Sequence, residues 1–454
     1  MIEGLLGRGL ARVGRSLLHH QKEIRRLQWA VVAFYLLLII GPVLLPLPSR
    51  TAHLWSNLTL FAQFVFWGIW WPFVLLSMAV VGRAWCGIFC PEGTLSEWAS
   101  AHGRARALPR WLVWRGWPFA AFVLTTLYGQ LVSVYQYPGP TLLILGGSSA
   151  AAMAVGYLYG RNKRVWCRYL CPVNGVFALL AKLAPLSFAV DEIKWRDTPP
   201  RAAPNCAPLV PIRTMTGSGG CHMCGRCADF REAVALSPRS PNQEVVHPSS
   251  TPAWPETALI LYGLFGVAMG AFHWSSSPYF IFAKNALAEW LLAHNIVWPL
   301  GATLPWSLLT NYPANQDVLT VLDGALLVFY IAAMTLIMGS LLLGFIVLAV
   351  RVSGVFSWER VHHAAHSLIP LAGAGVFLGL SAIGVSLLRG EGFVLAWLPA
   401  FRVLFLLGAS LWSGWLAFRI ICLWTTGWCN VLASFCLFAA IGLGLAGWML
   451  PLWW

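Results

Sequence analysis

Long apolar runs alternate with short polar turns along most of the chain. The runs approach or exceed the ~20 residues that an α-helix needs to cross a bilayer. The pattern predicts about nine membrane-spanning helices, at residues 28–47, 58–81, 117–134, 142–160, 256–273, 319–350, 365–388, 394–423 and 431–452. We therefore expect an all-α polytopic membrane protein.

Two longer segments, one polar and one a loop on the outer side, interrupt this alternation. The first, residues 188–255, is rich in Pro, Ser and Gly, and is expected to be a small separate segment. The second lies between residues 274 and 317, where Phe280–His294 is expected to form a helix in the membrane interface. The predicted order is thus a basic N-terminus (1–27), two helical hairpins (28–187), the polar segment (188–255) and a C-terminal helical membrane domain (256–454).

Composition supports a membrane protein. Of the 454 residues, 58% are hydrophobic and only 10% are charged, whereas soluble domains carry about a quarter of their residues as Asp, Glu, Lys or Arg. So little charge cannot cover a large water-facing surface. A soluble enzyme, a DNA-binding domain and a secreted disulfide scaffold are therefore excluded as descriptions of the whole chain.

The net charge of +14 follows the predicted membrane topology. Basic residues gather before the first run, after the second and after the fourth, and the intervening turns have almost none. Cytoplasmic loops carry such an excess. The charge therefore predicts a multi-pass membrane protein with a cytoplasmic N-terminus, and it does not indicate a nucleic-acid partner. The groups are Arg8, Arg12, Arg15, Lys22, Arg25 and Arg26; Arg83, Arg104, Arg106, Arg110 and Arg115; and Arg161, Lys163, Arg164, Arg168 and Lys182.

One sequence repeat carries candidate chemistry. The segment from Arg83 to Pro91, Arg-Ala-Trp-Cys-Gly-Ile-Phe-Cys-Pro, recurs 81 residues later from Arg164 to Pro172 as Arg-Val-Trp-Cys-Arg-Tyr-Leu-Cys-Pro. Each copy follows the cytoplasmic end of a predicted hairpin. The repeated unit is therefore two spans followed by a C-x3-C-P loop.

The polar segment adds a second cysteine motif, C-x2-C-x2-C. Clustered cysteines on the reducing cytoplasmic side point to metal binding or catalysis. Bacterial ferredoxins use the run C-x2-C-x2-C-x3-C-P, whose first part occurs here once and whose last part occurs twice. Zinc sites usually show paired C-x2-C knuckles. Iron–sulfur clusters are therefore the main prediction, with zinc and unligated thiols as alternatives. The cysteines concerned are Cys86, Cys90, Cys167, Cys171, Cys206, Cys221, Cys224 and Cys227.

The allocation of these ligands has two solutions. A complete ferredoxin run would place a fourth cysteine where Arg231 stands, followed by proline where Glu232 stands. In the favoured solution the two C-x3-C-P loops share one [4Fe–4S] cluster, and Cys206 completes a second with the triad. In the rival solution a loop cysteine completes the triad and Cys206 is free. The segment 188–255 is thus expected to be a cytoplasmic ferredoxin-like iron–sulfur segment.

Polar residues in the C-terminal half give weaker candidates. His362 and His366 lie one helical turn apart and could bind a metal, a haem or a quinone head group; alternatively they form a polar cap where a span begins. Asp323 and Arg402 fall inside apolar runs, where a charge is costly. They are therefore candidates for a quinone, ion or proton path; alternatively, they snorkel to the interface or pair with other charges. The remaining cysteines, Cys422, Cys429 and Cys436, are expected to be packing residues.

The repeated C-x3-C-P loops and the triad resemble the membrane-bound polyferredoxins over residues 28–235. That family includes the quinol dehydrogenase subunit of periplasmic nitrate reductase, the C-terminal part of the nitrous oxide reductase maturation regulator and the cytochrome oxidase assembly ferredoxin. This chain departs from them in its reduced ferredoxin part and in about 200 further C-terminal residues with five spans. The longer layout is similar to the polyferredoxin of bacterial ferrous-iron uptake systems.

The resemblance implies an electron-transfer subunit of an oxidoreductase or of a metal-uptake system in the bacterial inner membrane. Two cytoplasmic-side [4Fe–4S] clusters would exchange electrons with a quinone pool or with a periplasmic redox protein, in an iron-uptake setting beside a permease subunit. The alternatives are a quinol dehydrogenase that feeds a periplasmic reductase and a permease-like metal-handling protein with regulatory clusters. A haem or a bound quinone is a further cofactor candidate, and the lipid bilayer is an expected partner.

Overall fold

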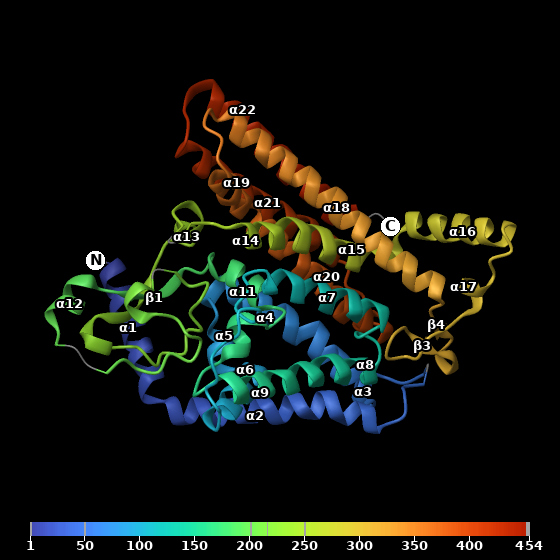
Figure 1. Cartoon of the computed structure of the whole chain (residues 1–454), viewed down its shortest axis with the longest axis horizontal. Coiled ribbons are helices and arrows are strands. Elements are labelled where there is room, and N and C mark those ends of the chain that lie inside the picture. The colour runs from blue at the N-terminus through green and yellow to red at the C-terminus, as the bar shows by residue number, and fades with distance from the viewer. Residues whose placement is uncertain (1, 50, 200–201, 216, 249–250, 451–454) are drawn as a thin grey trace. The chain divides into compact units, whose positions relative to one another are not determined.

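The computed structural model describes the whole chain except residues 1, 50, 200–201, 216, 249–250 and 451–454. The described part is mainly helical, with two short antiparallel strand pairs (Figure 1). The predicted all-α class is confirmed. The chain forms two compact units, of which unit 1 comprises residues 1–41, 73–121 and 145–251, and unit 2 comprises residues 42–72, 122–144 and 252–454.

Eight helices in the described residues are long and apolar enough to cross a membrane. They correspond to eight of the nine predicted spans. Some combine several regular segments, including π-helical turns at η2 (Phe64–Trp70), η3 (Leu142–Gly146) and η6 (Leu259–Ala268). The spans are Gln21–Leu44, Leu58–Val81, Pro138–Tyr159, Trp254–Ser276, Val321–Val352, Trp358–Gly390, Leu398–Cys422 and Gly427–Met449.

The predicted span at 117–134 is shorter than expected. It contains α7, Trp117–Leu131, of 15 residues, which at 1.5 Å per residue extends about 22 Å against a hydrocarbon core of about 30 Å. The chain turns directly afterwards, with the Val134 amide bonded back to the Gly129 carbonyl oxygen at 2.9 Å. The residues of this turn are themselves largely apolar, so hydropathy alone extended the predicted helix through it.

In unit 1, the short helix α6 (Pro91–Ala101) packs against both α2 (Gln21–Ile40) and α9 (Gly147–Tyr159), as Figure 1 shows. The Tyr35 hydroxyl group on α2 lies 3.0 Å from the Ser149 hydroxyl oxygen on α9 and fixes their contact. The other helices of this unit are α4 (Trp71–Val81, from residue 73), α5 (Ala84–Ile88), α10 (Val165–Tyr169) and α11 (Asn174–Ala181).

The segment after α11 folds on a small antiparallel sheet within unit 1. Strand β1 (Leu186–Val190) pairs with β2 (Val234–Pro238), with Phe188 opposite Leu236. Both side chains are buried, as the alternation of strand side chains requires when one face meets a core. The N-terminal helix α1 (Ile2–His19) packs along β2. The short helices α12 (Glu192–Asp197) and α13 (Gln243–Val246) complete this part.

Unit 2 is built around α18 (Val321–Val352), which packs against η6 and α22 (Gly427–Met449). The predicted helix at 280–294 is present as α16 (Pro278–Ala293). The remaining elements are α3 (Leu58–Gln63), α8 (Pro138–Thr141), α14 (Trp254–Ala258), α15 (Met269–His273), α17 (Trp298–Gly301), β3 (Asn311–Tyr312), β4 (Asp317–Val318), α19 (Trp358–Ala365), α20 (Ile369–Gly390) and α21 (Leu398–Cys422).

Asp323 has a structural partner set in this unit. Its carboxylate accepts a hydrogen bond from the Thr320 amide at 3.0 Å, and its own amide donates to the Thr320 hydroxyl oxygen at 3.3 Å, which together form a capping box at the start of α18. It also pairs with the Lys284 ammonium group on α16 at 2.5 Å. Helix capping and the ion pair with Lys284 therefore explain why an acid occurs inside an apolar run.

Candidate metal centre

The two C-x3-C-P loops have the same local structure. A five-residue helix follows each motif arginine, α5 in the first copy and α10 in the second. In the first copy the Cys90 amide donates to the Trp85 carbonyl oxygen at 2.9 Å. In the second the Cys171 amide donates to the Trp166 carbonyl oxygen at 3.0 Å. The sequence repeat is therefore also a structural repeat.

The loop cysteines form one buried electrostatic group: Cys86, Cys90, Cys167 and Cys171. Burial is the main cause that raises the pKa of Cys90 well above its usual value, and the charges of the Cys167 and Cys86 thiolates add to it. Burial outweighs the opposing charge of Arg164 and raises the pKa of Cys167 to about 12. Four such thiols cannot all ionise in this space without a cation, and a metal centre supplies the positive charge that lets thiolates form.

The second group contains the triad and Cys206. Burial, followed by the Cys224 and Cys206 thiolates, raises the pKa of Cys227 to about 12. The pKa of Cys206 is raised by burial and by Cys224. The Met223 amide lies 3.4 Å from the Cys221 sulfur, in position to donate to it. Cys206 therefore lies close enough to the triad for its charge to act on Cys221 and Cys227.

The two groups meet at Gly87. A β-carbon at this position would lie 2.1 Å from the His222 carbonyl oxygen and 3.0 Å from the Cys224 amide nitrogen. Only glycine allows this approach between the first loop and the backbone of the triad. The corresponding residue of the second loop is Arg168, so the two repeats differ where the first loop touches the triad.

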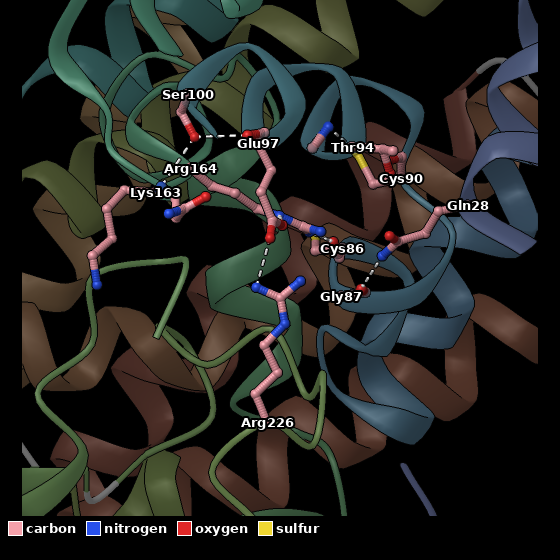
Figure 2. A network of polar contacts seen from close by, with 12 residues as sticks. Gln28, Cys86, Gly87, Cys90, Thr94, Glu97, Ser100, Lys163, Arg164 and Arg226 are labelled. Carbon is pink, nitrogen blue, oxygen red and sulfur yellow. Dashed lines mark hydrogen bonds and ion pairs between the residues drawn. The ribbon is translucent and has the colours of Figure 1, made fainter. Parts of the chain in front are cut away.

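A buried ion network joins the same regions (Figure 2). Arg164, whose side chain is 2% exposed, donates from Nε to Glu97 Oε2 at 2.8 Å and from Nη1 to the Cys86 carbonyl oxygen. The other Glu97 oxygen pairs with Arg226 Nη1 at 2.6 Å. Burial alone would raise the pKa of Glu97, but the Arg164 and Arg226 charges hold it below its usual value. One carboxylate therefore connects the second loop motif to the triad.

Further polar contacts hold the cysteine loops. Arg83, which is 3% exposed, donates to the Gly219 carbonyl oxygen and to Asn174 Oδ1, both at 2.8 Å. Gln28 donates to the Gly87 carbonyl oxygen at 2.8 Å. The Lys163 ammonium group donates to the Cys206 carbonyl oxygen at 3.1 Å. These contacts come from α2 and from both loop motifs, so the loops are fixed by the fold around them.

The donor sets fit iron–sulfur clusters. Each provides four thiols, buried or partly buried, with arginine side chains beside them that offset the negative charge of thiolates. Among the described residues, no three or more His, Cys, Asp or Glu side chains are gathered as they are around a single metal ion. A [4Fe–4S] cluster does not require that convergence, because each thiolate binds a different iron.

Sequence reasoning missed the acids and amides of the site. Glu97 belongs to the ion network, and the Glu92 carboxylate accepts a hydrogen bond from Trp166 Nε1 at 3.2 Å. Gln21 bonds to the triad backbone through the Cys224 carbonyl oxygen at 3.0 Å. A signal existed: Glu92 and Glu97 are acids in a strongly basic region, and the second repeat has Val173 and Ala178 in their places.

In unit 2, His362 and His366 both contact the start of the span at 254–276. His362 Nδ1 lies 3.0 Å from the Thr257 hydroxyl oxygen, and His366 Nε2 lies 2.9 Å from Glu256 Oε2. His366 is fully buried. Both histidines therefore have protein partners on α14.

The last three cysteines were expected to be packing residues. Cys436 is partly buried, but Cys422 and Cys429 are exposed, so packing within the chain does not account for these two.

Comparison with known proteins supports the same region. A 4Fe-4S binding domain matches residues 63–109 and again 142–188. The chain is 26% identical over 244 residues to YccM of Escherichia coli (strain K12), named as an electron transport protein; this covers 45% of the chain and 65% of YccM. It is 29% identical over 185 residues to the regulatory protein NosR of Pseudomonas aeruginosa, covering 35% of the chain and 25% of NosR. No solved structure matches.

The predicted resemblance to membrane-bound proteins with repeated 4Fe-4S domains is confirmed at this level. The two matched segments are the two copies of the repeat, each with its C-x3-C-P loop. The match spans less than two thirds of either relative. Together, the domains, the relatives and the apolar helices support a membrane electron-transfer role.

Proposed function

We propose that this chain binds two [4Fe–4S] clusters and uses them to exchange electrons with the membrane quinone pool. The first ligand set is Cys86, Cys90, Cys167 and Cys171, and the second is Cys206, Cys221, Cys224 and Cys227. The observation that carries the proposal is the close approach of Gly87, the neighbour of Cys86, to the backbone of His222 and Cys224. Adjacent redox centres are what an electron carrier needs.

The clusters, when bound, would supply one-electron chemistry. The residues of the chain would hold the clusters and tune their reduction potentials. Arg83 and Arg164 offset negative charge beside the first group, and Arg226 does so beside the second. The Gly93 amide lies 3.3 Å from the Cys90 sulfur and can donate to it, which stabilises a thiolate. The loops bury some of the thiols and partly cover the others, which limits the access of water to them.

Quinone is the exchange partner favoured by a specific pair in unit 2. A quinol that loses two electrons also releases two protons, so a quinol site needs proton acceptors. The His366 imidazole and the Glu256 carboxylate lie 2.9 Å apart at the start of two apolar spans, with Glu256 37% exposed at its side chain. Such a pair can take up a proton from a hydroxyl group placed beside it.

Ferrous-iron uptake beside a permease rests on the layout of the C-terminal half alone. No contact among the described residues of unit 2 favours an iron path. A quinol dehydrogenase that feeds a periplasmic reductase uses the same chemistry as the proposal and differs only in its acceptor. A permease-like protein with regulatory clusters would need neither quinone nor rapid electron exchange.

The test is reduction of the clusters by a quinol. The protein is purified without oxygen and reconstituted in proteoliposomes, and cluster absorbance and EPR signals are followed after addition of menaquinol, with dithionite as reference. The proposal predicts that menaquinol changes the oxidation state of the clusters in the wild type. Clusters that respond to dithionite and never to menaquinol or menaquinone would refute the quinone assignment and leave the electron-transfer role standing.

We further propose that the N-terminus and both cysteine groups face the cytoplasm of a bacterial inner membrane. The basic loops beside both groups support this orientation. Reporter fusions after Arg196, in the segment between β1 and β2, test it. Cytoplasmic reporter activity is expected, and activity of a periplasmic reporter at this site would reverse the topology.

A further inference from the structure

The N-terminal helix α1 has a basic face that the clusters do not use. Arg8, Arg12, Arg15 and His19 recur at spacings of four, three and four residues, which places them on one face of a helix. All four residues are exposed. The described side chains of α1 thus present a continuous basic stripe about three turns long.

The opposite face of α1 is already occupied by the protein. Leu10 and Leu18 pack against the buried core that includes Phe188 and Leu236. A β-carbon at Gly14 would lie 3.1 Å from the Leu236 side chain, so the helix runs close along β2. Among the described side chains of α1, Leu10 and Leu18 therefore face the core of unit 1. The exposed ones are basic or polar, except Val13.

The C-terminal end of α1 lies beside the second cysteine group. Leu17 is the nearest neighbour of Gly225, between Cys224 and Cys227. Directly after the helix, Gln21 donates to the Cys224 carbonyl oxygen at 3.0 Å and accepts a bond from Arg226 Nε at 3.3 Å. A molecule bound to the basic stripe would be separated from this cysteine group by a single helix.

A membrane-surface role explains the stripe less well. Helices that lie on membranes bury an apolar face in the boundary between headgroups and acyl chains. In α1 that face is committed to the core around Phe188. Among its described exposed residues Val13 is the single apolar one and lies beside the basic stripe, so the stripe itself suits a negatively charged protein surface.

We propose that the basic face of α1 is the docking surface for a soluble, acidic one-electron carrier protein of the ferredoxin or flavodoxin class. This rests on the proposed function, because the carrier would serve the centre held by Cys206, Cys221, Cys224 and Cys227. With quinol as the electron donor to the clusters, that centre would be oxidised by one electron and the carrier reduced by one electron; with quinone as the final acceptor, the carrier would be oxidised and the centre reduced. In either direction no bond or proton moves. Complementary charge would speed and orient the encounter.

The test measures binding directly. The full chain is placed in phosphatidylcholine nanodiscs, and binding of a purified acidic [2Fe–2S] ferredoxin is measured by microscale thermophoresis at low and high salt. The double variant Arg12→Gln/Arg15→Gln is compared with Arg106→Gln/Arg110→Gln, which removes two exposed charges elsewhere in unit 1. We expect the α1 variant to bind about tenfold or more weakly at low salt, and the control variant to bind like the wild type.

Equal binding by the two double variants would overturn the proposal. So would loss of wild-type ferredoxin binding when phosphatidylglycerol is added, because the stripe would then belong to lipid. Iron content and reduction by dithionite are measured on the same samples. A preparation with reducible clusters that does not bind ferredoxin contradicts the docking surface alone, and one without clusters contradicts the proposed function whatever the binding result.

Discussion

Arg83 and Arg164 occupy the same position in the two copies of the repeat, and each donates hydrogen bonds to the other copy. Arg83 reaches Asn174 Oδ1 after the second loop at 2.8 Å, and Arg164 reaches the Cys86 carbonyl oxygen in the first loop. Both side chains are almost fully buried. This exchange ties the loops together, so that one group of thiols can be assembled from two distant parts of the chain.

Two substitutions of Arg164 distinguish the effect of its charge from the effect of its hydrogen bonds. Arg164→Gln removes a buried positive charge, which favours the less negative, oxidised state of a nearby centre. We expect midpoint potentials lower by on the order of 50 mV in redox titrations followed by EPR. It also removes one of the two arginine partners of the partly buried Glu97, and because Arg226 remains, we expect a loss of stability below the roughly 3 kcal/mol that an unpaired buried charge costs.

Arg164→Lys keeps the charge and loses the planar fork. This variant should retain potentials close to those of the wild type while losing part of the stability. Arg110→Gln, at an exposed position, is the control for both measurements. If Arg164→Gln keeps its iron and its potentials, the charge of Arg164 does not act on the clusters.

Acid should weaken the ion network through Glu97. Because the folded-state pKa of Glu97 is lowered from 4.5, its ionised form contributes stability at pH 7. That contribution is lost as the pH falls below about 4.5 and through the folded-state pKa. Melting temperatures should therefore fall between pH 5 and 3.5 by less in Glu97→Gln than in the wild type. Parallel pH profiles would show that other carboxylates control acid unfolding.

The close approach at Gly87 gives a steric test. Gly87→Ala places a methyl group 2.1 Å from the His222 carbonyl oxygen, so the loop that bears the triad must move. We expect loss of iron from the second site and loss of any magnetic coupling between the two centres in EPR spectra. Gly147→Ala, where a β-carbon has open space, is the matched control and should leave both unchanged. A Gly87→Ala protein with the wild-type spectrum would disprove the contact.

The quinone assignment predicts a selective effect in unit 2. His366→Gln removes a proton acceptor beside Glu256 and should slow cluster reduction by menaquinol by about 100-fold. Reduction by dithionite and iron content should be unaffected, because no cluster ligand is changed. His294→Gln, at an exposed histidine, controls for general effects. Equal slowing with both reductants would indicate a folding defect in place of a quinol site.

Much of the architecture follows from the sequence, because bilayer crossing imposes length and apolarity on each span. Eight predicted spans and the repeated loop were found in this way. The span at 117–134 failed because apolar residues also form the turn after Leu131. Hydropathy reports where a chain can be buried and does not report where its backbone reverses direction.

The cysteines of the site were easier to predict from the sequence than the other residues that surround them. Spacing identified the thiols, but the position of Cys206 beside the triad depends on tertiary contacts such as that between Lys163 and the Cys206 carbonyl oxygen. The roles of Glu97 and Gln21 depend on side-chain directions that only the folded structure fixes. The histidines lay at the predicted helix start, and their partners Glu256 and Thr257 come from a span about 100 residues earlier.

The central claim is that two separate cysteine groups each hold one [4Fe–4S] cluster. It is tested most directly by iron and acid-labile sulfide analysis of anaerobically purified wild type, Cys90→Ser, Cys224→Ser and the control Cys436→Ser. We predict about eight iron and eight sulfide for the wild type and the control, and about four of each for Cys90→Ser and Cys224→Ser, with different EPR signals remaining. Zinc without sulfide, or loss of all iron in both variants, would contradict two independent cluster sites.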